Sequence, residues 1–140
     1  MKTICHLLIA AALGTLVAAS AHAGDVKVIA NETVKASAVS SDELKGVFLA
    51  TKTSLDGSHV EPVLMKSGAA HEAFLKQYVG KTGNALETYY RSLVFTGKGS
   101  MPKTLASDAE VVEYVAKTKG AIGYVSGDAA TDGVKVLEVK

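Results

Sequence analysis

Five consecutive residues, Ser67 to His71 (SGAAH), have the types and spacing that suit anion binding. Small residues at a strand-to-helix turn leave backbone N–H groups open, and the positive end of the helix dipole favours a negative ligand there. The Ser67 hydroxyl predicts a helix N-cap, and the His71 imidazole is partly protonated near neutral pH. The turn therefore predicts an anion site, although an ordinary capped helix with an exposed histidine explains the same residues. The predicted ligand-binding residues are Ser67, Gly68, Ala69, Ala70 and His71.

A glycine-rich basic segment runs from Thr96 to Ser100 (TGKGS). A phosphate-cradling P-loop has the order G-x-x-x-x-G-K-[ST] after a strand, whereas here a glycine follows the lysine. That order argues against nucleotide binding. Glycine and lysine are also ordinary residues of solvated connections. The segment is therefore either such a connection or a loop that closes over a ligand or meets a partner protein, with Lys98 as the contact residue.

Residue patterns typical of catalysis and of metal binding are missing from the sequence. It has no G-x-S-x-G motif, and most carboxylates fall at helix caps or on outward helix faces. His59 and His71 fall on different expected elements, without a second histidine at helical or hairpin spacing. A metal site could be formed by His59 with Asp56 and Glu61, but the sequence has no dense cluster of metal ligands. We expect no enzyme activity, no metal and no cofactor.

The N-terminus has the pattern of a secretory signal. Met1-Lys2 is followed by an apolar run from Ile4 to Ala19 and by Ala21-His22-Ala23, an A-x-A cleavage site. We expect a cleaved signal peptide at residues 1–23 and a single domain at residues 24–140, exported to the periplasm. A retained N-terminal anchor is the alternative, but the apolar run is shorter than the roughly 20 residues of a spanning helix.

Composition narrows the class of partner. The chain has 15 Lys and Arg against 14 Asp and Glu, and only Lys2 lies in the signal, so the exported part is formally neutral. A nucleic acid or an anionic membrane would favour a basic patch. The single cysteine, Cys5, also lies in the signal, which leaves no disulfide and no thiol nucleophile. We expect one domain with no nucleic-acid partner and no membrane span after the signal.

The segment from Ser107 to Val125 predicts a helix followed by a buried strand. Ser107 and Glu110 form a capping box, and apolar residues then recur at helical spacing until Gly120 ends the helix. Ala121 to Val125 is short, apolar and without alternation, which is typical of a strand covered on both faces of a parallel or mixed sheet. Gly123 within it indicates close approach of another element.

Other segments give the remaining expected elements. Asp56-Gly57 predicts a hairpin turn, and Pro62 places part of the next strand at a sheet edge or at its first residues. Strands and helices in this order favour an α/β layer fold with a small, partly parallel sheet. The further predictions are a strand at 26–30, a helix capped by Ser40 and Glu43 that buries Leu44, Val47 and Phe48, a helix from Ser67 to Gly80, a helix capped by Asn84 and Glu87, and a last strand with Val134 and Val136 inward.

The run Gly120 to Val125 (GAIGYV), placed after such a helix, resembles the second lobe of the phosphate-binding subunits of ABC transporters, a type of periplasmic solute-binding protein. Three further segments support the resemblance in the same order, and it covers nearly the whole chain after the signal. Small single-lobe secreted relatives are more similar still, through Val94 to Gly99 and Pro102-Lys103. The three segments are Ser40 to Leu49 (SSDELKGVFL), Asp56-Gly57 through Val63, and Ser67 to Phe74 (SGAAHEAF).

The resemblance implies a single lobe of a type II periplasmic-binding-protein-like fold, with a small mixed sheet flanked by helices. It also implies binding of phosphate or a related small anion without turnover, in a transport role. In that family the ligand loop offers hydroxyl donors and an arginine, and the corresponding positions here hold Gly68, Ala70 and His71. Because the chain supplies one lobe, a closed site needs a homodimer or a partner in the cell envelope. The alternative is an accessory interaction module that keeps the lobe and has lost the ligand.

Overall fold

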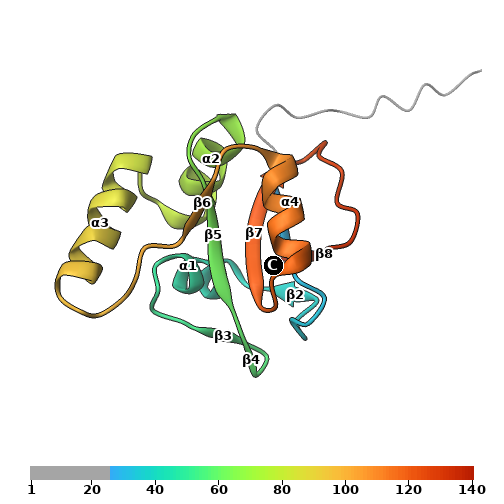
Figure 1. The fold of residues 1–140 in the computed structure, drawn as a ribbon, viewed down its shortest axis with the longest axis horizontal. Coiled ribbons are helices and arrows are strands. Elements are labelled where there is room, and N and C mark those ends of the chain that lie inside the picture. Colours follow the sequence, from blue (N-terminus) through green and yellow to red (C-terminus); the bar gives the residue numbers. More distant parts are fainter. Residues whose placement is uncertain (1–25) are drawn as a thin grey trace, which may run out of the picture.

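The computed structural model describes residues 26–140, so the expected signal peptide lies outside the described residues. Strands and helices are interspersed along the chain (Figure 1). Among the described residues, none of the helices is long and apolar enough to cross a membrane. The strands are β1 (Val26–Ala30), β2 (Ala38–Val39), β3 (Ser54–Leu55), β4 (Ser58–His59), β5 (Glu61–Met65), β6 (Lys103–Leu105), β7 (Ala121–Ser126) and β8 (Lys135–Val139). The helices are α1 (Ser41–Phe48), α2 (Ala69–Phe74) with its π-helical continuation η1 (Leu75–Val79), α3 (Gly83–Phe95) and α4 (Asp108–Lys117).

Six strands form one mixed sheet in the order β2-β8-β1-β7-β5-β6, and β3 pairs with β4 in a separate hairpin. β5 is parallel to β6 and β7, and β2 is parallel to β8, whereas β1 is antiparallel to both β7 and β8. β1 therefore runs against the other five strands. This confirms the predicted α/β layer fold with a partly parallel sheet. It also brings the carboxyl ends of β5, β6 and β7 to one edge of the sheet.

Helices cover both faces of the sheet. An added Cβ at Gly123 of β7 would lie 3.0 Å from Val111 Cγ1 of α4, so α4 packs closely over this position. The next residue, Tyr124, points to the opposite face, where it packs on Phe48 of α1 and Phe74 of α2. Figure 1 shows α4 crossing in front of the sheet. The predicted close approach at Gly123 is thus the packing of α4.

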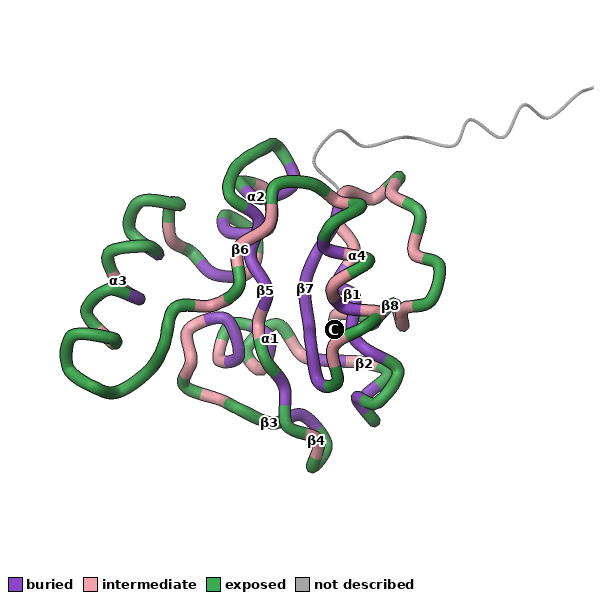
Figure 2. The backbone as a smooth tube through the Cα atoms, in the orientation of Figure 1, coloured by how far each residue is buried: buried purple, intermediate pink, exposed green. Residues whose placement is uncertain are grey.

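Aromatic rings form the centre of the core beneath α1 and α2. The Tyr124 and Phe74 rings are stacked with centroids 3.9 Å apart, and Phe48 meets Phe74 edge-on at 4.7 Å. All three residues are fully buried, as is β7 along nearly its whole length (Figure 2). Such ring contacts add about 1 kcal/mol each to the burial of the rings themselves. The unbroken apolar sequence of β7 predicts this two-sided burial.

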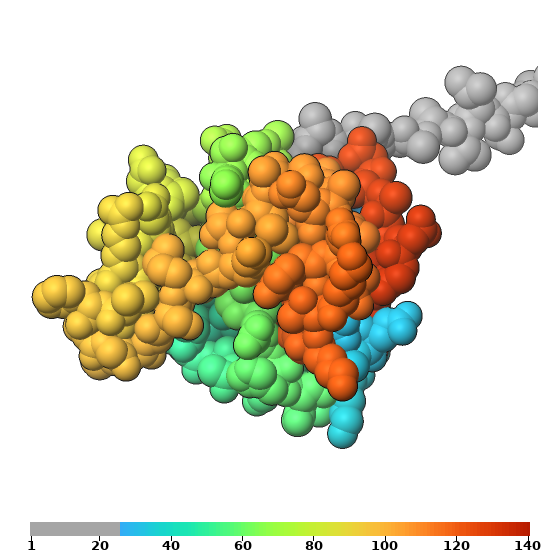
Figure 3. Space-filling view, viewed as in Figure 1, coloured from blue at the N-terminus to red at the C-terminus, as the bar shows by residue number. Residues whose placement is uncertain are grey.

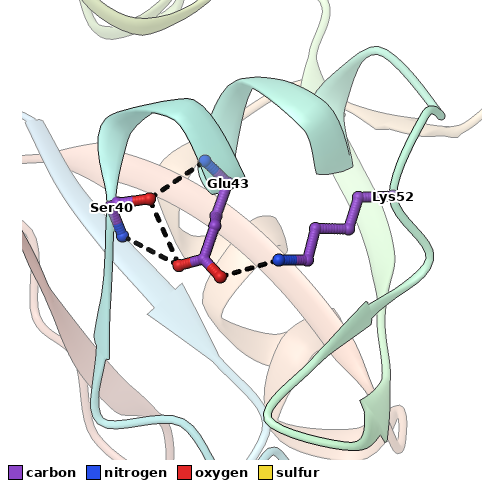
Figure 4. A network of polar contacts seen from close by, with 3 residues as sticks. All are labelled: Ser40, Glu43 and Lys52. Atoms are coloured by element: carbon purple, nitrogen blue, oxygen red, sulfur yellow. Dashed lines mark hydrogen bonds and ion pairs between the residues drawn. The ribbon is translucent and has the colours of Figure 1, made fainter.

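The predicted capping box of α1 is confirmed (Figure 4). Ser40 Oγ accepts from the Glu43 N–H, and the Glu43 carboxylate accepts from the Ser40 N–H, both at 3.2 Å. Lys52 Nζ donates to the other carboxylate oxygen at 2.7 Å, and this bond holds the pKa of Glu43 below its usual range. The contact fastens the segment after α1 to the start of the helix. As predicted, the face formed by Leu44, Val47 and Phe48 is buried.

The predicted start of α4 is confirmed with one change. Ser107 Oγ accepts from the Glu110 N–H at 3.3 Å, but the Glu110 carboxylate accepts from the N–H of Ala106, one residue earlier than a capping box requires. The helix ends at Lys117, and Gly120 follows with a φ of +76°, in the left-handed region.

The hairpin signal Asp56-Gly57 is also confirmed. Both residues have positive φ, +45° and +77°, and they join β3 to β4. Pro62 is the second residue of β5, and β6 pairs with β5 only from Val63 onward. The side of β5 beside Pro62 therefore faces no paired strand, which suits a residue without an N–H donor.

The expected cap of α3 is wrong. Thr82, not Asn84, is the N-cap, because Thr82 Oγ1 accepts from the Ala85 N–H at 3.2 Å. Glu87 forms an ion pair with Arg91 one turn later, so it does not close a capping box with Asn84. Two cap-forming residues lie two positions apart here, and tertiary packing decides between them.

The expected inward face of the last strand is wrong as well. The register between β1 and β8 sets Leu137 opposite Val28, so Leu137 is buried and Val136 is exposed. A shift of one residue exchanges the two faces of a strand, and in this segment both odd-numbered and even-numbered positions carry apolar residues. The sequence pattern alone therefore does not identify the inward face.

Candidate functional site

The candidate site lies at the carboxyl ends of β5 and β6, in the loops that follow these two strands. β5 continues into α2 on the face that holds Tyr124, whereas β6 continues into α4 on the face of Gly123. The two loops thus leave the sheet toward opposite faces, and open α/β sheets bind ligands at such switch points. Between these two strand ends, the Lys66 N–H donates to the Leu105 carbonyl at 2.9 Å.

Ser67 does not cap α2, which corrects the expectation from sequence. The N-cap is Gly68, and no side chain accepts a hydrogen bond from this helix start. Within residues 26–140, the backbone N–H groups from Ser67 to His71 have no hydrogen-bond acceptor. The other α-helices, by contrast, start under the side-chain caps Ser40, Thr82 and Ser107. The start of α2 therefore keeps open donors for a ligand or for water.

Gly68 gives this turn its shape. Its φ of 115° and ψ of 169° lie in a region that glycine alone occupies without strain. An added Cβ would meet nothing within 4 Å, so the position requires the backbone freedom of glycine and not its small size. Ser67, Gly68 and Ala69 are exposed, while Ala70 and His71 are buried. The five predicted residues thus form one turn whose first three members face solvent.

The His71 side chain is largely buried, and its Nδ1 is held by a contact within the protein. His71 is 7% exposed, and its Nδ1 contacts the Tyr124 hydroxyl. The same hydroxyl accepts from the Met65 N–H at 3.0 Å. Because Met65 ends β5 and His71 belongs to the first turn of α2, the Tyr124 hydroxyl ties together the two sides of the Ser67 to Ala70 turn. His71 thus positions the turn, which corrects the expectation of a partly charged imidazole at the ligand.

These bonds assign the tautomer of His71. The Tyr124 oxygen accepts from Met65, so its O–H is left to donate to His71 Nδ1, and the imidazole proton resides on Nε2. Burial lowers the pKa of His71, and Glu72 in the same turn opposes this to a smaller extent. Burial also raises the pKa of Tyr124. Both side chains are therefore uncharged near neutral pH.

Mild acid is expected to destabilise the protein through His71. Folding lowers its pKa from the ordinary value of about 6.5, so the unfolded chain binds the proton more readily. The free energy of unfolding should be highest above about pH 6.5, fall as the pH drops below that value, and level off below the folded-state pKa. Urea denaturation between about pH 7.5 and pH 5 measures this decrease.

The variant His71→Asn tests the assignment, because an amide keeps a polar atom near the Tyr124 hydroxyl and does not titrate. We expect this variant to lose the decrease, and His59→Asn, at an exposed position, to retain it. The carboxylates with lowered pKa, Glu43 and Glu113, titrate below the usual 4.5 and so outside this range. An unchanged decrease in His71→Asn would place the titrating group elsewhere.

The neighbouring start of α4 is unsuited to an anion. Its side chains already occupy nearby donors: Ser107 and Glu110 accept as described above, and Asp108 Oδ1 accepts from the Ser126 N–H at 3.2 Å. Two carboxylates in one helical turn also repel a negative ligand. Of the two loops, this leaves the turn before α2 as the one compatible with an anion.

Lys98, the further contact expected from sequence, lies apart from this turn. It lines a groove of about 720 Å³ beside the first residues of β5, to which none of Ser67 to His71 contributes. His71 instead lines a smaller hollow of about 260 Å³ between β5 and α3. The structure therefore places Lys98 beside the amino end of β5, whereas the turn follows its carboxyl end.

The combination of Asp56, His59 and Glu61 is not assembled into a metal centre. His59 Nε2 and Glu61 Oε1 lie 4.0 Å apart, and both side chains are largely exposed. Within the part of the chain that the structure describes, no three histidine, cysteine or acidic side chains come together as metal ligands.

Two residues of the site, Met65 and Tyr124, are not found by reasoning from sequence. Their hydrogen bond joins positions 59 residues apart, which no local pattern reveals. One signal does exist. A tyrosine in an otherwise aliphatic buried strand needs a hydrogen-bond partner for its hydroxyl, and such a partner marks a constrained position elsewhere in the fold.

No protein-family model matches the chain, and no curated protein matches it in sequence. Solved structures do match it. An ABC-type phosphate transport receptor from Vibrio cholerae superposes with a TM-score of 0.64 at 13% identity, over 81% of this chain and 45% of the receptor. PstS from Borrelia burgdorferi superposes with a TM-score of 0.63 at 14% identity, over 82% of this chain and 47% of its own.

A third similar structure contains phosphate. It comes from Clostridium perfringens and is described as a phosphate ABC transporter substrate-binding protein with bound phosphate; the TM-score is 0.62 at 17% identity, over 81% of this chain and 44% of that one. The chain spans less than half the length of these three structures. The described residues therefore have the fold of a single lobe of the phosphate-type substrate-binding proteins of ABC transporters.

Proposed function

We propose that this protein is an exported solute-binding lobe that binds phosphate or a related small anion without turnover. One observation carries the proposal: the backbone N–H groups from Ser67 to His71 have no acceptor within the described residues, in a fold similar to that of phosphate-binding proteins. The exposed Ser67 hydroxyl and Lys66 ammonium lie in the same turn and favour an anion. In this proposal Ser67 also contributes its side chain, whereas Gly68, Ala69, Ala70 and His71 contribute backbone N–H groups.

Binding at this turn is expected to be weak for the lobe alone. A helix N-terminus stabilises an exposed anion by about 0.3 to 1 kcal/mol, and each hydrogen bond to a charged group adds about 1.5 to 3 kcal/mol. Water and salt screen these terms at an open turn. The described lobe spans less than half the length of similar structures, and in this proposal a second lobe, from another copy or from an envelope protein, closes the site.

The chemistry of the turn supports binding in preference to turnover. The neutral His71 ring is buried and occupied by the Tyr124 hydroxyl, so it is not placed to act as a general base for Ser67. Export to the periplasm belongs to the same proposal and rests on the signal pattern of residues 1–23.

Calorimetric titration of the purified protein with phosphate, sulfate and small organic anions tests the proposal. The informative variant is Ala69→Asp, because Ala69 is exposed at the first position of α2. An aspartate there is compatible with the helix and repels a bound anion. At about 5 Å the repulsion is on the order of 1 kcal/mol, which corresponds to a roughly fivefold loss of affinity.

The matched control is Ala85→Asp, which places the same charge at an exposed position in the first turn of α3. It should leave the affinity within about twofold of the wild type. The proposal fails if no anion binds to the folded protein, or if both variants bind phosphate as the wild type does.

A further inference from the structure

The groove lined by Lys98 has no part in the proposed anion site. It runs past the amino end of β5, the end of α1 and the loop that leads into β6, with a volume of about 720 Å³. This volume falls within the range of about 300 to 1,000 Å³ typical of ligand sites. Beside it, Pro62 marks the stretch of β5 that β6 does not cover. The groove is therefore a hollow along an unpaired strand edge.

Apolar side chains form part of the lining, and α3 and the loop after it carry exposed apolar side chains as well. Met101 lines the groove and is 49% exposed. Val94 and Phe95, the last two residues of α3, are 46% and 92% exposed. Figure 3 shows α3 and the loop after it, in yellow to light orange, projecting from the body of the molecule. Exposed large apolar side chains next to a groove are typical of a surface that meets another protein.

Positive charge dominates the polar part of the lining. Among residues 26–140, no carboxylate lies within 4.0 Å of Lys98 or Lys103, although the Lys103 ammonium lies 5.8 Å from the ring centroid of Tyr114. The third lysine, Lys52, is paired with Glu43. Glu61 is the one carboxylate among the lining residues. Two lysines without carboxylate partners thus border a groove whose lining is part apolar and part polar.

We propose that this groove docks an acidic segment of a partner protein that carries an apolar anchor residue. The anchor packs against Met101 and the apolar floor, and its acidic neighbours pair with Lys98 and Lys103. Charge complementarity selects the segment, and a groove of about 720 Å³ is larger than a small anion fills. This site is separate from the turn at Ser67 and stands or falls independently of the anion proposal.

The test uses a fluorescein-labelled synthetic peptide with two glutamates on each side of a Phe-Leu pair, titrated with the purified protein and followed by fluorescence anisotropy. We expect saturable binding with a Kd on the order of 10 to 100 μM. A peptide with glutamine in place of glutamate should bind at least roughly tenfold more weakly, and salt should weaken the acidic peptide. Backbone amide shifts on addition of peptide should cluster at residues 60–63 and 98–104.

The double variant Lys98→Glu with Lys103→Glu should lower the affinity for the acidic peptide roughly tenfold or more. The matched control reverses two exposed lysines outside the groove, Lys45 and Lys76, to glutamate and should leave it within about twofold. Titration of both double variants with phosphate shows whether the substitutions also change binding at the separate anion site. The proposal is overturned if the acidic peptide shows no saturable binding up to about 1 mM, if the glutamine peptide binds equally well, or if the lysines of the groove have no more effect than the control pair.

Discussion

Replacement of Gly120 by alanine is expected to lower the free energy of unfolding by roughly 3 to 5 kcal/mol. Gly120 has a φ of +76°, where an alanine is strained by about 1 to 2 kcal/mol. In addition, an added Cβ would lie 2.6 Å from the carbonyl oxygen of His59, and a backbone atom cannot turn away as a side chain can. Both the backbone strain and the clash with His59 arise from the added Cβ atom.

The surrounding hydrogen bonds prevent Gly120 from moving aside. Its N–H donates to Thr33 Oγ1 at 3.1 Å, and its carbonyl accepts from the Glu61 N–H at 2.8 Å. The second of these bonds lies where β5 begins to pair with β7, because Glu61 is opposite Ala121. A displacement of Gly120 therefore also loosens the pairing of β5 with β7.

Gly133→Ala is the matched control. Gly133 has nearly the same φ, +77°, but an added Cβ there would lie 3.8 Å from Ala116 Cβ, an ordinary contact. This variant should lose only about 1 to 2 kcal/mol, so the difference between the two variants measures the clash with His59. Urea denaturation with an unchanged slope gives both values. Equal losses would contradict the close approach of Gly120 to His59.

The features that the sequence predicts correctly depend on residues that lie close together along the chain. The α1 and α4 starts depend on serine and glutamate residues three positions apart, and the hairpin depends on Asp56-Gly57, so local patterns predict all of them. β7 is predicted because Ala121 to Val125 are apolar without alternation, which is typical of a strand covered on both faces. Composition, caps and turns thus establish the fold class.

Features that depend on pairing between distant segments escape such reasoning. β2 and β6 have two and three residues, and they are strands only because β8 and β5 lie beside them. The inward face of β8 follows from its register against β1, not from its own sequence. The same limit applies to the site: the turn at Ser67 is predictable, but the Tyr124 hydroxyl that fixes its geometry is not.

The variant Tyr124→Phe is expected to lower the free energy of unfolding by about 2 to 4 kcal/mol while leaving the ring packing intact. Phenylalanine keeps the stacked contact with Phe74, so the change removes only the hydroxyl. The buried Met65 N–H then loses its acceptor, and His71 Nδ1 loses its donor. Each buried polar group left without a partner costs about 1 to 3 kcal/mol.

Tyr89→Phe is the control for this variant, because the Tyr89 hydroxyl donates to the Leu49 carbonyl at 2.6 Å but the residue is only half-buried. Its loss should be about 1 kcal/mol or less. A double-mutant cycle of Tyr124→Phe with His71→Asn should give a coupling of at least about 0.5 kcal/mol, since the two side chains share one bond. A Tyr124→Phe protein as stable as the wild type would show that the hydroxyl has no such role.

The same variant separates the shape of the turn from its sequence. Ser67 to Ala70 remain unchanged in Tyr124→Phe, yet the tie between the end of β5 and the first turn of α2 is cut. Amide hydrogen exchange at Lys66 and Glu72, whose N–H groups donate to the Leu105 and Gly68 carbonyls on either side of the turn, should therefore accelerate more than the global loss of stability requires. Because backbone N–H groups bind an anion only while they converge on it, phosphate affinity in the folded variant should fall together with that protection. Retained affinity with a loosened turn would show that the anion is held elsewhere on the lobe.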